Sequence, residues 1–200
     1  MEAVKFPKDH GMSYRFIDWG EMGQYIYELA GKILPHEKKF DRIIALATGG
    51  LTMSRALKDL LQIPRHSTIQ ISFYTGVGER SAMPVISQSV ATNIEGERIL
   101  IFDDINETGG SLKTAKQYCE MRGAKEIVTA TIFQKPHTQF PSDYYAKGEN
   151  CWLLLPDEIR EMGQLLTAKW RKQGLTDKQV ETRLKKVGFS QEHIEFIKGK

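Results

Sequence analysis

Cysteine is scarce in this chain of 200 residues, which holds only Cys119 and Cys151, far apart and without a CxxC pattern. The five histidines form no group with the spacing of metal ligands. A disulfide framework and a structural zinc site are therefore disfavoured. Long hydrophobic runs are also missing, and the opening MEAVKFPKDH lacks the apolar segment of a secretory signal. We expect a cytoplasmic protein with no membrane span.

A strong net charge is missing as well. The 28 basic and 25 acidic side chains leave a formal charge of +3, and residues 157–200 hold ten of the basic and seven of the acidic ones. A surplus this small is typical of a solvated helical surface, so nucleic acid is not an expected partner. With 40% hydrophobic and 26% charged residues, the chain can bury a sizeable core, and we expect one domain with a small appendage.

What the sequence does contain is a regular alternation of apolar patterns. Four short apolar runs of strand length are separated by segments of helical spacing, and Asp18 with Glu21 has the pattern of a capping box before the first helix. Such alternation favours right-handed βαβ units, hence the α/β class, with a central, mostly parallel sheet flanked by helices. The expected strands lie in DRIIALATGG (41–50), TIQISFY (68–74), RILIF (98–102) and EIVTATIF (126–133), and the expected helices at 19–34, 51–61 and 112–121.

The segment from Thr75 to Ala91 shows no sustained period. Loops of this length are uncommon in compact domains and often serve as lids over a binding site. We expect a lid over about residues 75–91, with a plain surface hairpin as the alternative.

Two adjacent carboxylates, Asp103 and Asp104, follow the apolar run ILIF, and a glycine pair comes shortly after them. If the run is a buried parallel strand, these residues lie at its carboxyl end, where α/β proteins bind ligands. The helix that begins on the glycine pair offers free amides to an anion, whereas the carboxylates suit sugar hydroxyls or a hydrated Mg²⁺. A phosphorylated ribose satisfies both demands. The alternative is a capped turn that binds nothing.

The order of strand, glycine pair and helix recurs in RIIALATGGLTMSRAL (42–57). Neither glycine pair belongs to a Walker motif, because no GK[ST] follows it. Two anion sites, together with two carboxylates that suit a diol, would fit a ribose that carries phosphate groups at two places. Phosphoribosyl pyrophosphate is such a ligand, with a 5′-phosphate at one end and a pyrophosphate on C1′ at the other.

These motifs resemble those of the type I phosphoribosyltransferase family, and the chain is most similar to its 6-oxopurine branch, the xanthine-guanine and hypoxanthine-guanine enzymes. ILIFDDINETGGS meets the family signature of four apolar residues, two acids and a TGG[ST] turn. The likeness spans roughly residues 13–157 and includes YRFIDWGEMGQ, the ATGG loop, Lys135-Pro136 and WLLLP at 152–156. It implies a type I phosphoribosyltransferase domain at 1–157 with a small hood, followed by an extension at 158–200.

The resemblance implies how phosphoribosyl pyrophosphate is held. Asp103 and Asp104 would bind the ribose hydroxyls directly or through Mg²⁺, with Asp157 as a further metal ligand. The pyrophosphate loop, which often carries a non-proline cis peptide in this family, would be formed by Thr48, Gly49 and Gly50. The other contacts would come from Thr108, Gly109, Gly110 and Ser111 on the 5′-phosphate and from Tyr74 and Arg80 in the lid.

The resemblance also implies a purine-binding end. Lys135 would donate a hydrogen bond to the 6-oxo group, Trp152 would stack on the ring, and Leu153 would offer its backbone carbonyl to the purine edge. Glu107 would accept or share the proton at N7. The expected activity is Mg²⁺-dependent transfer of the phosphoribosyl group to N9 of guanine, xanthine or hypoxanthine, with release of pyrophosphate, in purine salvage. Homo-oligomers, dimers or tetramers, are expected.

Two departures from the family pattern leave alternatives open. Glu107 is longer by one methylene than the aspartate usual there, and Thr48 stands where a basic residue is common, so that Arg55 or Arg80 would have to replace it. A regulator of the same fold that binds phosphoribosyl pyrophosphate or a nucleotide is one alternative. A transferase for another nucleobase, such as adenine or a pyrimidine, is the other. Lys135 and Trp152 disfavour the regulator, and a lysine facing the amino group of adenine is a poor match.

The tail from residue 176 carries its own helix signals. Thr176 with Gln179 has the pattern of a capping box, and Gly188 suits a helix end. Ser190 begins a second short helical pattern. Each predicted helix has one narrow apolar stripe and is too short to be stable in isolation. We expect both to pack on each other and on the catalytic domain or a second subunit, a frayed terminus being the alternative. The stripes are Val180, Leu184 and Val187, and Ile194 and Ile197.

Overall fold

The structure, a computed structural model, describes residues 2–7, 9–36, 39–74 and 83–199. The chain divides into two compact units. The sheet unit comprises Gly23–Glu149, and the terminal unit combines Met1–Met22 with Asn150–Lys200. The terminal unit is thus built from both ends of the chain, and a domain boundary after residue 157 stays a prediction.

A six-stranded sheet of order β5-β4-β3-β6-β7-β8 forms the sheet unit. All neighbouring strands are parallel except β4 and β5, which are antiparallel. The inner strands are buried on both faces because their apolar runs have no polar break, as in β3 and β6. This confirms the predicted α/β class. The strands are β3 (Arg42–Ala47), β4 (Arg65–Tyr74), β5 (Met83–Gln88), β6 (Arg98–Asn106), β7 (Glu126–Gln134) and β8 (Tyr144–Gly148).

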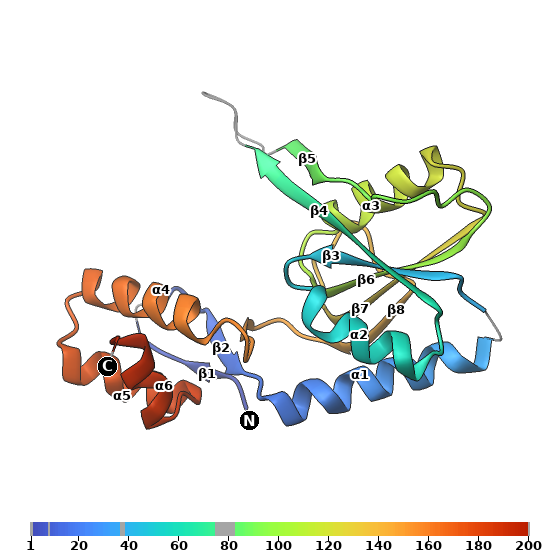
Figure 1. Cartoon of the computed structure of the whole chain (residues 1–200). Coiled ribbons are helices and arrows are strands. Elements are labelled where there is room, and N and C mark those ends of the chain that lie inside the picture. The colour runs from blue at the N-terminus through green and yellow to red at the C-terminus, as the bar shows by residue number, and fades with distance from the viewer. Residues whose placement is uncertain (1, 8, 37–38, 75–82, 200) are drawn as a thin grey trace. The chain divides into compact units, whose positions relative to one another are not determined.

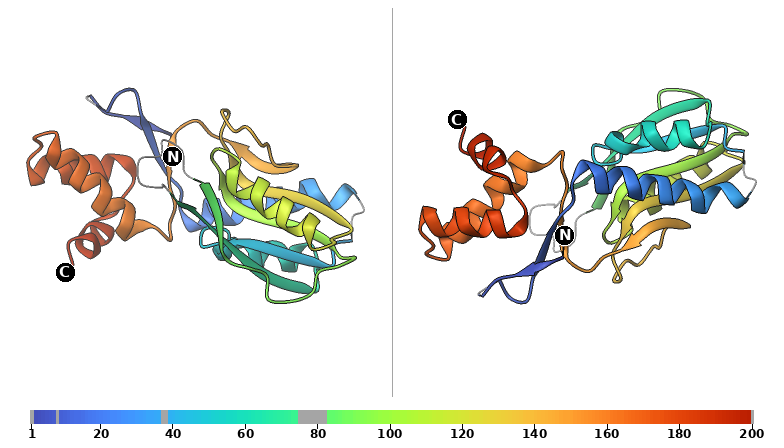
Figure 2. Two further views of the ribbon diagram at one scale, coloured as in Figure 1. Left: turned by 90° about the horizontal axis from the view of Figure 1, so that it is seen from above. Right: turned by 90° about the horizontal axis from the view of Figure 1, so that it is seen from below.

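Helices cover both faces of this sheet (Figures 1 and 2). α3 (Gly110–Met121) lies on one face, and α2 (Leu51–Leu60) lies on the other with the part of α1 (Trp19–Ile33) that belongs to the sheet unit. α1 continues into a short 3-10 helix, η1 (Leu34–His36). The predicted capping box of α1 is present, since the Glu21 amide donates to Asp18 Oδ1 at 2.8 Å and the Asp18 amide donates to Glu21 Oε2 at 3.4 Å.

Part of the segment predicted as a lid is a strand. β5 pairs antiparallel with β4 at one edge of the sheet, so residues 83–88 are not loop, and a lid function of the segment stays a prediction. The alternating pattern of β5 is weak in sequence, because Pro84 interrupts it and Val85, Ser87 and Gln88 are exposed as well. β8 was not predicted either. Residues 75–82, where the rest of the lid prediction falls, lie outside the described residues.

The terminal unit contains a small sheet and three helices. The sheet has the order β1-β2-β9, with β2 and β9 parallel although about 135 residues separate them in the chain. The strands are β1 (Val4–Lys5), β2 (Ser13–Phe16) and β9 (Trp152–Leu154), and the helices are α4 (Ile159–Lys172), α5 (Asp177–Val187) and α6 (Gln191–Ile197).

The C-terminal helices share one core with the small sheet. The predicted capping box at Thr176 is present before α5, and Ser190, predicted to begin a second helical pattern, also forms one before α6. The prediction that the tail helices pack rather than fray is confirmed, and α4 supplies the surface that completes their packing. The buried members of this core are Tyr14, Phe16, Leu154, Leu166, Trp170, Val180, Leu184, Val187, Phe189, Ile194 and Ile197.

A buried carboxylate, Asp9, ties the amino-terminal segment to α4. Its side chain is 1% exposed and accepts hydrogen bonds from Trp170 Nε1 at 3.1 Å and Gln173 Nε2 at 2.8 Å. Lys169 and Arg183 approach it to 4.0 and 3.8 Å. Burial alone raises the pKa of Asp9, but the hydrogen bonds and the Lys169 charge outweigh burial and hold the pKa below the usual 3.8.

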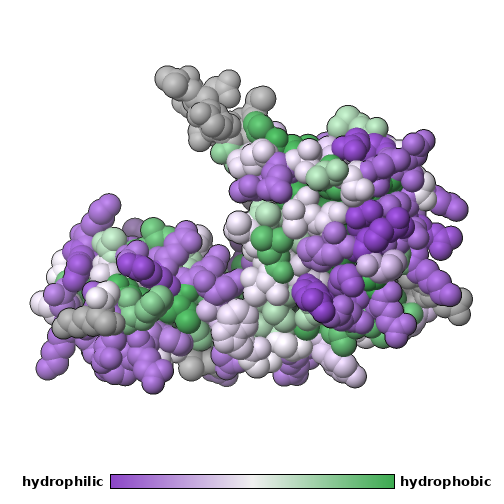
Figure 3. Space-filling view, viewed as in Figure 1, coloured by the Kyte–Doolittle hydropathy of each residue, from purple (hydrophilic) through white to green (hydrophobic). Residues whose placement is uncertain are grey.

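The surface of the molecule mixes hydrophilic and hydrophobic residues over the face drawn in Figure 3. Such a mixture is ordinary for a folded protein. Among the described residues, none of the helices combines the length and the apolar character that crossing a membrane requires.

We predict that Asp9→Ala destabilises the protein by about 1–3 kcal/mol at pH 7, because it leaves buried donors without an acceptor. The difference from the wild type should shrink below about pH 4, since a carboxylate with a depressed native pKa loses its stabilising effect as it becomes protonated. Urea denaturation at pH 7 and pH 3 measures both effects. Asp177→Ala, which removes an exposed ion pair with Arg171, is the control and should cost less than about 1 kcal/mol. Equal stability of the two variants at pH 7 would contradict the prediction.

Candidate functional site

Two glycine-containing loops leave the sheet side by side. β3 and β6 are adjacent parallel strands, with Ala45 opposite Phe102. The loops that follow them, at residues 48–50 and 107–109, therefore lie at the same edge of the sheet. This edge is the carboxyl end of the strands, where α/β folds bind their ligands.

The first loop packs so closely on the end of β6 that only glycine fits. A Cβ on Gly49 would lie 2.5 Å from Asp104 Oδ2, and a Cβ on Gly50 would lie 2.7 Å from the Phe102 carbonyl oxygen and 2.8 Å from that of Leu46. The Ala47–Thr48 peptide bond is cis. Gly50 caps α2 without a side-chain hydrogen bond. The loop thus presents backbone, rather than side chains, beside the two aspartates.

Asp103 and Asp104 are half-buried at the end of β6. Burial, followed by the charge of Asp104, raises the pKa of Asp103 well above its usual range. Asp103 Oδ1 accepts a hydrogen bond from the Asp104 amide at 3.0 Å, and Asp104 Oδ1 accepts one from the Ile105 amide at 2.6 Å. Two crowded carboxylates of this kind are well suited to hydroxyl donors or to a cation, either of which offsets their repulsion.

The second loop ends in an uncapped helix start. Gly109 has φ +89°, and a Cβ there would lie 2.5 Å from Phe140 Cβ, so another residue would be strained as well as crowded. The N-cap residue Gly109 offers no side-chain hydrogen bond, and the Gly110 amide donates a long one, 3.5 Å, to Thr108 Oγ1. The amides of its first turn open on a pocket of about 140 Å³, an arrangement that favours an anion. The pocket is lined by Phe73, Asp103, Ile105, Asn106, Glu107, Thr108, Gly109, Gly110, Ser111 and Leu112.

Three polar side chains gather beside this loop. Lys135, 5% exposed, follows the end of β7, and its Nζ lies 4.0 Å from Glu107 Oε2. His137 Nε2 lies 3.1 Å from the other carboxylate oxygen, Glu107 Oε1. The carboxylate of Glu107 therefore lies between an ammonium and an imidazole.

Hydrogen bonds hold the turn after β7 against the loop after β6. The Lys135 amide donates to the Asn106 carbonyl at 3.0 Å. Thr138 Oγ1 donates to Asn106 Oδ1 at 3.1 Å, and Asn106 Nδ2 donates to the Phe140 carbonyl at 2.9 Å. Sequence analysis did not single out His137 or Asn106. A signal for His137 was nevertheless present in the sequence. It is a polar residue just beyond β7, and β7 pairs with β6 in parallel, so that both strands end at the same edge of the sheet.

The structure brings some predicted site residues together and leaves others apart. The two loops, both aspartates, Glu107 and Lys135 belong to one edge of the sheet unit. Tyr74 ends β4, but its side chain and all of Arg80 lie outside the described residues. Arg55 donates from Nε to Asp59 Oδ2 at 2.8 Å on an exposed turn of α2.

Trp152, Leu153 and Asp157 belong to the terminal unit. Trp152 is 47% exposed and Leu153 is buried in β9, where they pair with Tyr14 and Arg15. Among the described residues, no group of three or more His, Cys, Asp or Glu side chains could by itself hold a metal ion. A magnesium ion at Asp103 and Asp104 would therefore need ligand oxygens from the substrate or water.

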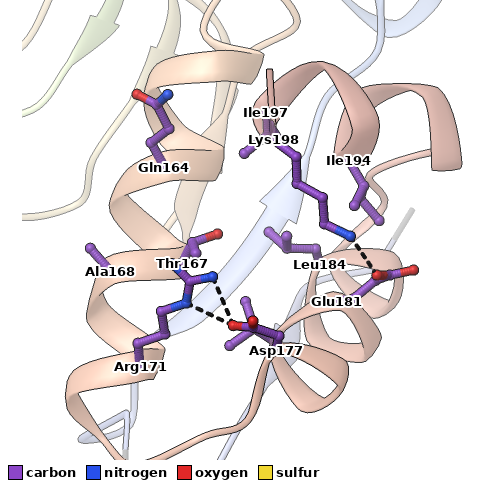
Figure 4. A pocket seen from close by; sticks show the side chains of 11 residues that line it. Gln164, Thr167, Ala168, Arg171, Asp177, Glu181, Leu184, Ile194, Ile197 and Lys198 are labelled. Atoms are coloured by element: carbon purple, nitrogen blue, oxygen red, sulfur yellow. Dashed lines mark hydrogen bonds and ion pairs between the residues drawn. The ribbon is translucent and has the colours of Figure 1, made fainter. Parts of the chain in front are cut away.

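A separate cavity lies among α4, α5 and α6 (Figure 4). It measures about 520 Å³. Its charged side chains pair with each other, Arg171 with Asp177 at 2.7 Å and Lys198 with Glu181 at 2.8 Å. None of the predicted site residues lines it. We therefore place the candidate functional site at the sheet edge and not in this cavity.

A mostly parallel sheet with two glycine loops and two carboxylates at one edge is an α/β arrangement that suits a phosphorylated, hydroxyl-bearing ligand. The chain belongs to the family of the phosphoribosyl transferase domain, whose model matches residues 15–152. The predicted family and fold are confirmed.

Relatives of known name are purine phosphoribosyltransferases. The chain is 28% identical over 143 residues to the xanthine-guanine phosphoribosyltransferase of Idiomarina loihiensis, a match that covers 70% of this chain and 84% of that protein. It is 41% identical over 66 residues to the hypoxanthine-guanine phosphoribosyltransferase of Streptococcus pyogenes, covering 33% of this chain and only 37% of that one. The crystal structure of a purine phosphoribosyltransferase from Pyrococcus horikoshii matches with a TM-score of 0.64 and 30% identity, over 72% of this chain and 92% of the other.

We predict that Gly50→Ala destabilises the protein by about 1–3 kcal/mol, because the new methyl group would meet two backbone carbonyls that cannot move independently. Gly49→Ala should cost less, because the Asp104 side chain can rotate away, but it should weaken ligand binding by displacing that carboxylate. Gly31→Ala in α1, where a Cβ meets nothing within 4 Å, is the control and should be neutral or stabilising. Urea denaturation midpoints of the three variants give the order of their stabilities. A Gly50→Ala protein as stable as Gly31→Ala would contradict it.

Proposed function

We propose that this protein transfers the 5-phosphoribosyl group of phosphoribosyl pyrophosphate to N9 of a 6-oxopurine, guanine, xanthine or hypoxanthine, with release of pyrophosphate, in purine salvage. The observation that carries the proposal is the pair of carboxylates, Asp103 and Asp104, between two glycine loops at one sheet edge. The relatives' names support the substrate class. A cytoplasmic location and assembly into dimers or tetramers stay predictions.

The proposed ligand matches the site group by group. The amides at the start of α3, with Thr108 and Ser111, would hold the 5′-phosphate. The loop of Thr48, Gly49 and Gly50, at the start of α2, would hold the pyrophosphate. The two aspartates between the loops would accept hydrogen bonds from the ribose hydroxyls.

The residues present also fit a magnesium ion. Mg²⁺ binds through one or two carboxylates together with phosphate oxygens and water, and the crowded pair Asp103 and Asp104 offers those carboxylates. Asp157 remains a proposed further ligand. When bound, Mg²⁺ would neutralise the charge that develops on the departing pyrophosphate.

At the base, a donor and an acceptor would meet two neighbouring atoms of the purine. Lys135 would donate to the 6-oxo oxygen, and Glu107 would accept the proton from N7 while N9 attacks C1′. The 4.0 Å between Lys135 Nζ and Glu107 Oε2 supports this arrangement, because O6 and N7 lie on the same edge of the purine. Trp152 would stack on the base and the Leu153 carbonyl would accept from its far edge.

The chemistry proposed for these residues is positioning and charge stabilisation. As the C1′–oxygen bond breaks, positive charge grows on the sugar and negative charge grows on the pyrophosphate. The amides of the first loop would stabilise the departing oxygens, and removal of the N7 proton would make N9 a better nucleophile. Holding both substrates in attack geometry would supply much of the remaining rate.

The direct test is to incubate the purified protein with Mg²⁺, phosphoribosyl pyrophosphate and each base in turn, and to measure nucleotide formation and pyrophosphate release. We expect turnover with at least one 6-oxopurine and none with adenine, uracil or orotate. Binding of phosphoribosyl pyrophosphate without turnover on any base would favour the regulator instead. Turnover with another base alone would favour the other transferase. Omitting Mg²⁺ or adding a chelator should abolish turnover.

We predict that Asp103→Asn with Asp104→Asn lowers kcat/KM for phosphoribosyl pyrophosphate by about 100-fold or more, since hydrogen bonds to charged groups contribute about 1.5–3 kcal/mol each. Melting temperature should stay the same or rise, because neutral amides remove the cost of a charged Asp103 in the fold. Steady-state kinetics and thermal melting are compared on the same preparations. Wild-type kinetics in the double variant would remove these residues from the site.

Lys135→Met should lower kcat/KM for 6-oxopurines by about 10- to 150-fold, the equivalent of a lost charged hydrogen bond of about 1.5–3 kcal/mol. Methionine keeps most of the buried side-chain volume, so stability should change little. KM for phosphoribosyl pyrophosphate should not change. The exposed Lys113 of α3 is the control, and Lys113→Met should behave as the wild type. Unchanged kinetics of Lys135→Met with every purine would exclude the assignment.

A further inference from the structure

His137 contacts the side chain to which the proposed function gives the proton transfer. Its Nε2 lies 3.1 Å from Glu107 Oε1, while Lys135 Nζ lies 4.0 Å from Oε2. The two carboxylate oxygens thus face different neighbours. The imidazole occupies one oxygen and leaves the other beside the ammonium that would bind the 6-oxo group.

The backbone that carries His137 is fixed relative to Glu107. Asn106, next to Glu107, bonds the turn at Lys135, Thr138 and Phe140 through its carbonyl and its side chain. Asn106 is buried, so these bonds are shielded from water. His137 is therefore presented to Glu107 by a rigid support, although both side chains are exposed, by 55% and 56%.

A glutamate in this position has a positioning problem. Its side chain has three rotatable bonds, one more than the aspartate to which the family resemblance points, and an exposed carboxylate on such a chain samples several rotamers. Proton transfer needs the accepting oxygen within hydrogen-bond distance of N7. A hydrogen bond to the opposite oxygen, from an imidazole on a fixed backbone, reduces the number of rotamers.

We infer that His137 is a positioning residue, which donates from Nε2 to Glu107 Oε1 and so directs Oε2 toward the purine edge beside Lys135. This inference rests on the proposed function. His137 does not touch the base and transfers no proton itself. Its contribution passes entirely through Glu107 and belongs to the step with the base, so that binding of phosphoribosyl pyrophosphate does not depend on it.

A double-mutant cycle tests the inference. His137→Ala, Glu107→Ala and the double variant are assayed with the best 6-oxopurine, together with His137→Gln, whose side-chain amide can donate to the same oxygen. We expect His137→Ala to lower kcat about tenfold, a loss that corresponds to one hydrogen bond to a charged group. KM for phosphoribosyl pyrophosphate should be unchanged, and His137→Gln should recover to within about threefold of the wild type. In the Glu107→Ala background, removal of His137 should have no further effect.

The controls separate the possible failures. Gln139→Ala removes an exposed side chain from the same turn and should match the wild type in kcat. Melting temperatures identify any variant whose loss is structural. If the wild type turns over no purine, both the proposed function and this inference are wrong. If the wild type is active and His137→Ala matches it, or if the two losses simply add, only the inference is overturned.

Discussion

The repulsion between the neighbouring carboxylates of Asp103 and Asp104 limits which groups can lie beside them at the sheet edge. Asp103 and Asp104 stand at the end of a buried strand, where water cannot fully solvate their charge. The loop opposite them carries no side chain at Gly49 or Gly50, and backbone amides face the site in place of further acids. A ligand that brought hydroxyl groups, or a cation, would offset this repulsion. Burial and the neighbouring charge raise the pKa of Asp103, which means that its charged form is unfavourable without such a partner.

Much of the fold follows from local patterns in the sequence. The continuous apolar runs at RIIALA and RILIF identify β3 and β6 as strands buried on both faces, and the capping boxes at Asp18, Thr176 and Ser190 mark helix starts that the structure contains. β5 and β8 could not be predicted this way. Both are edge strands with exposed residues, so their pairing depends on a neighbouring strand already being in place and not on their own pattern.

Some residues of the candidate site could likewise be predicted from the sequence, and others could not. Carboxylates and glycines at strand ends are visible in sequence, because parallel strands bring their carboxyl ends to one edge. The pairing of Glu107 with His137 is not visible in the sequence, since it depends on how the turn after β7 folds against the loop after β6. Asn106 arranges that contact from a buried position at the end of a strand, where its sequence context resembles a solvent-exposed loop. Long-range hydrogen bonds of this kind have no local signature.

The composition of the terminal unit from both chain ends has a consequence for biosynthesis. During translation, residues 23–149 emerge as one continuous segment, and the sheet unit can complete its strand pairing as soon as that segment has left the ribosome. The β9 and helical partners of Tyr14, Phe16 and Asp9 are made after the sheet unit, because they lie between residues 152 and 197. The segment that holds Asp9, Tyr14 and Phe16 is thus synthesised before the sheet unit but reaches its native packing after it, and its apolar side chains stay in water until residue 197 has emerged.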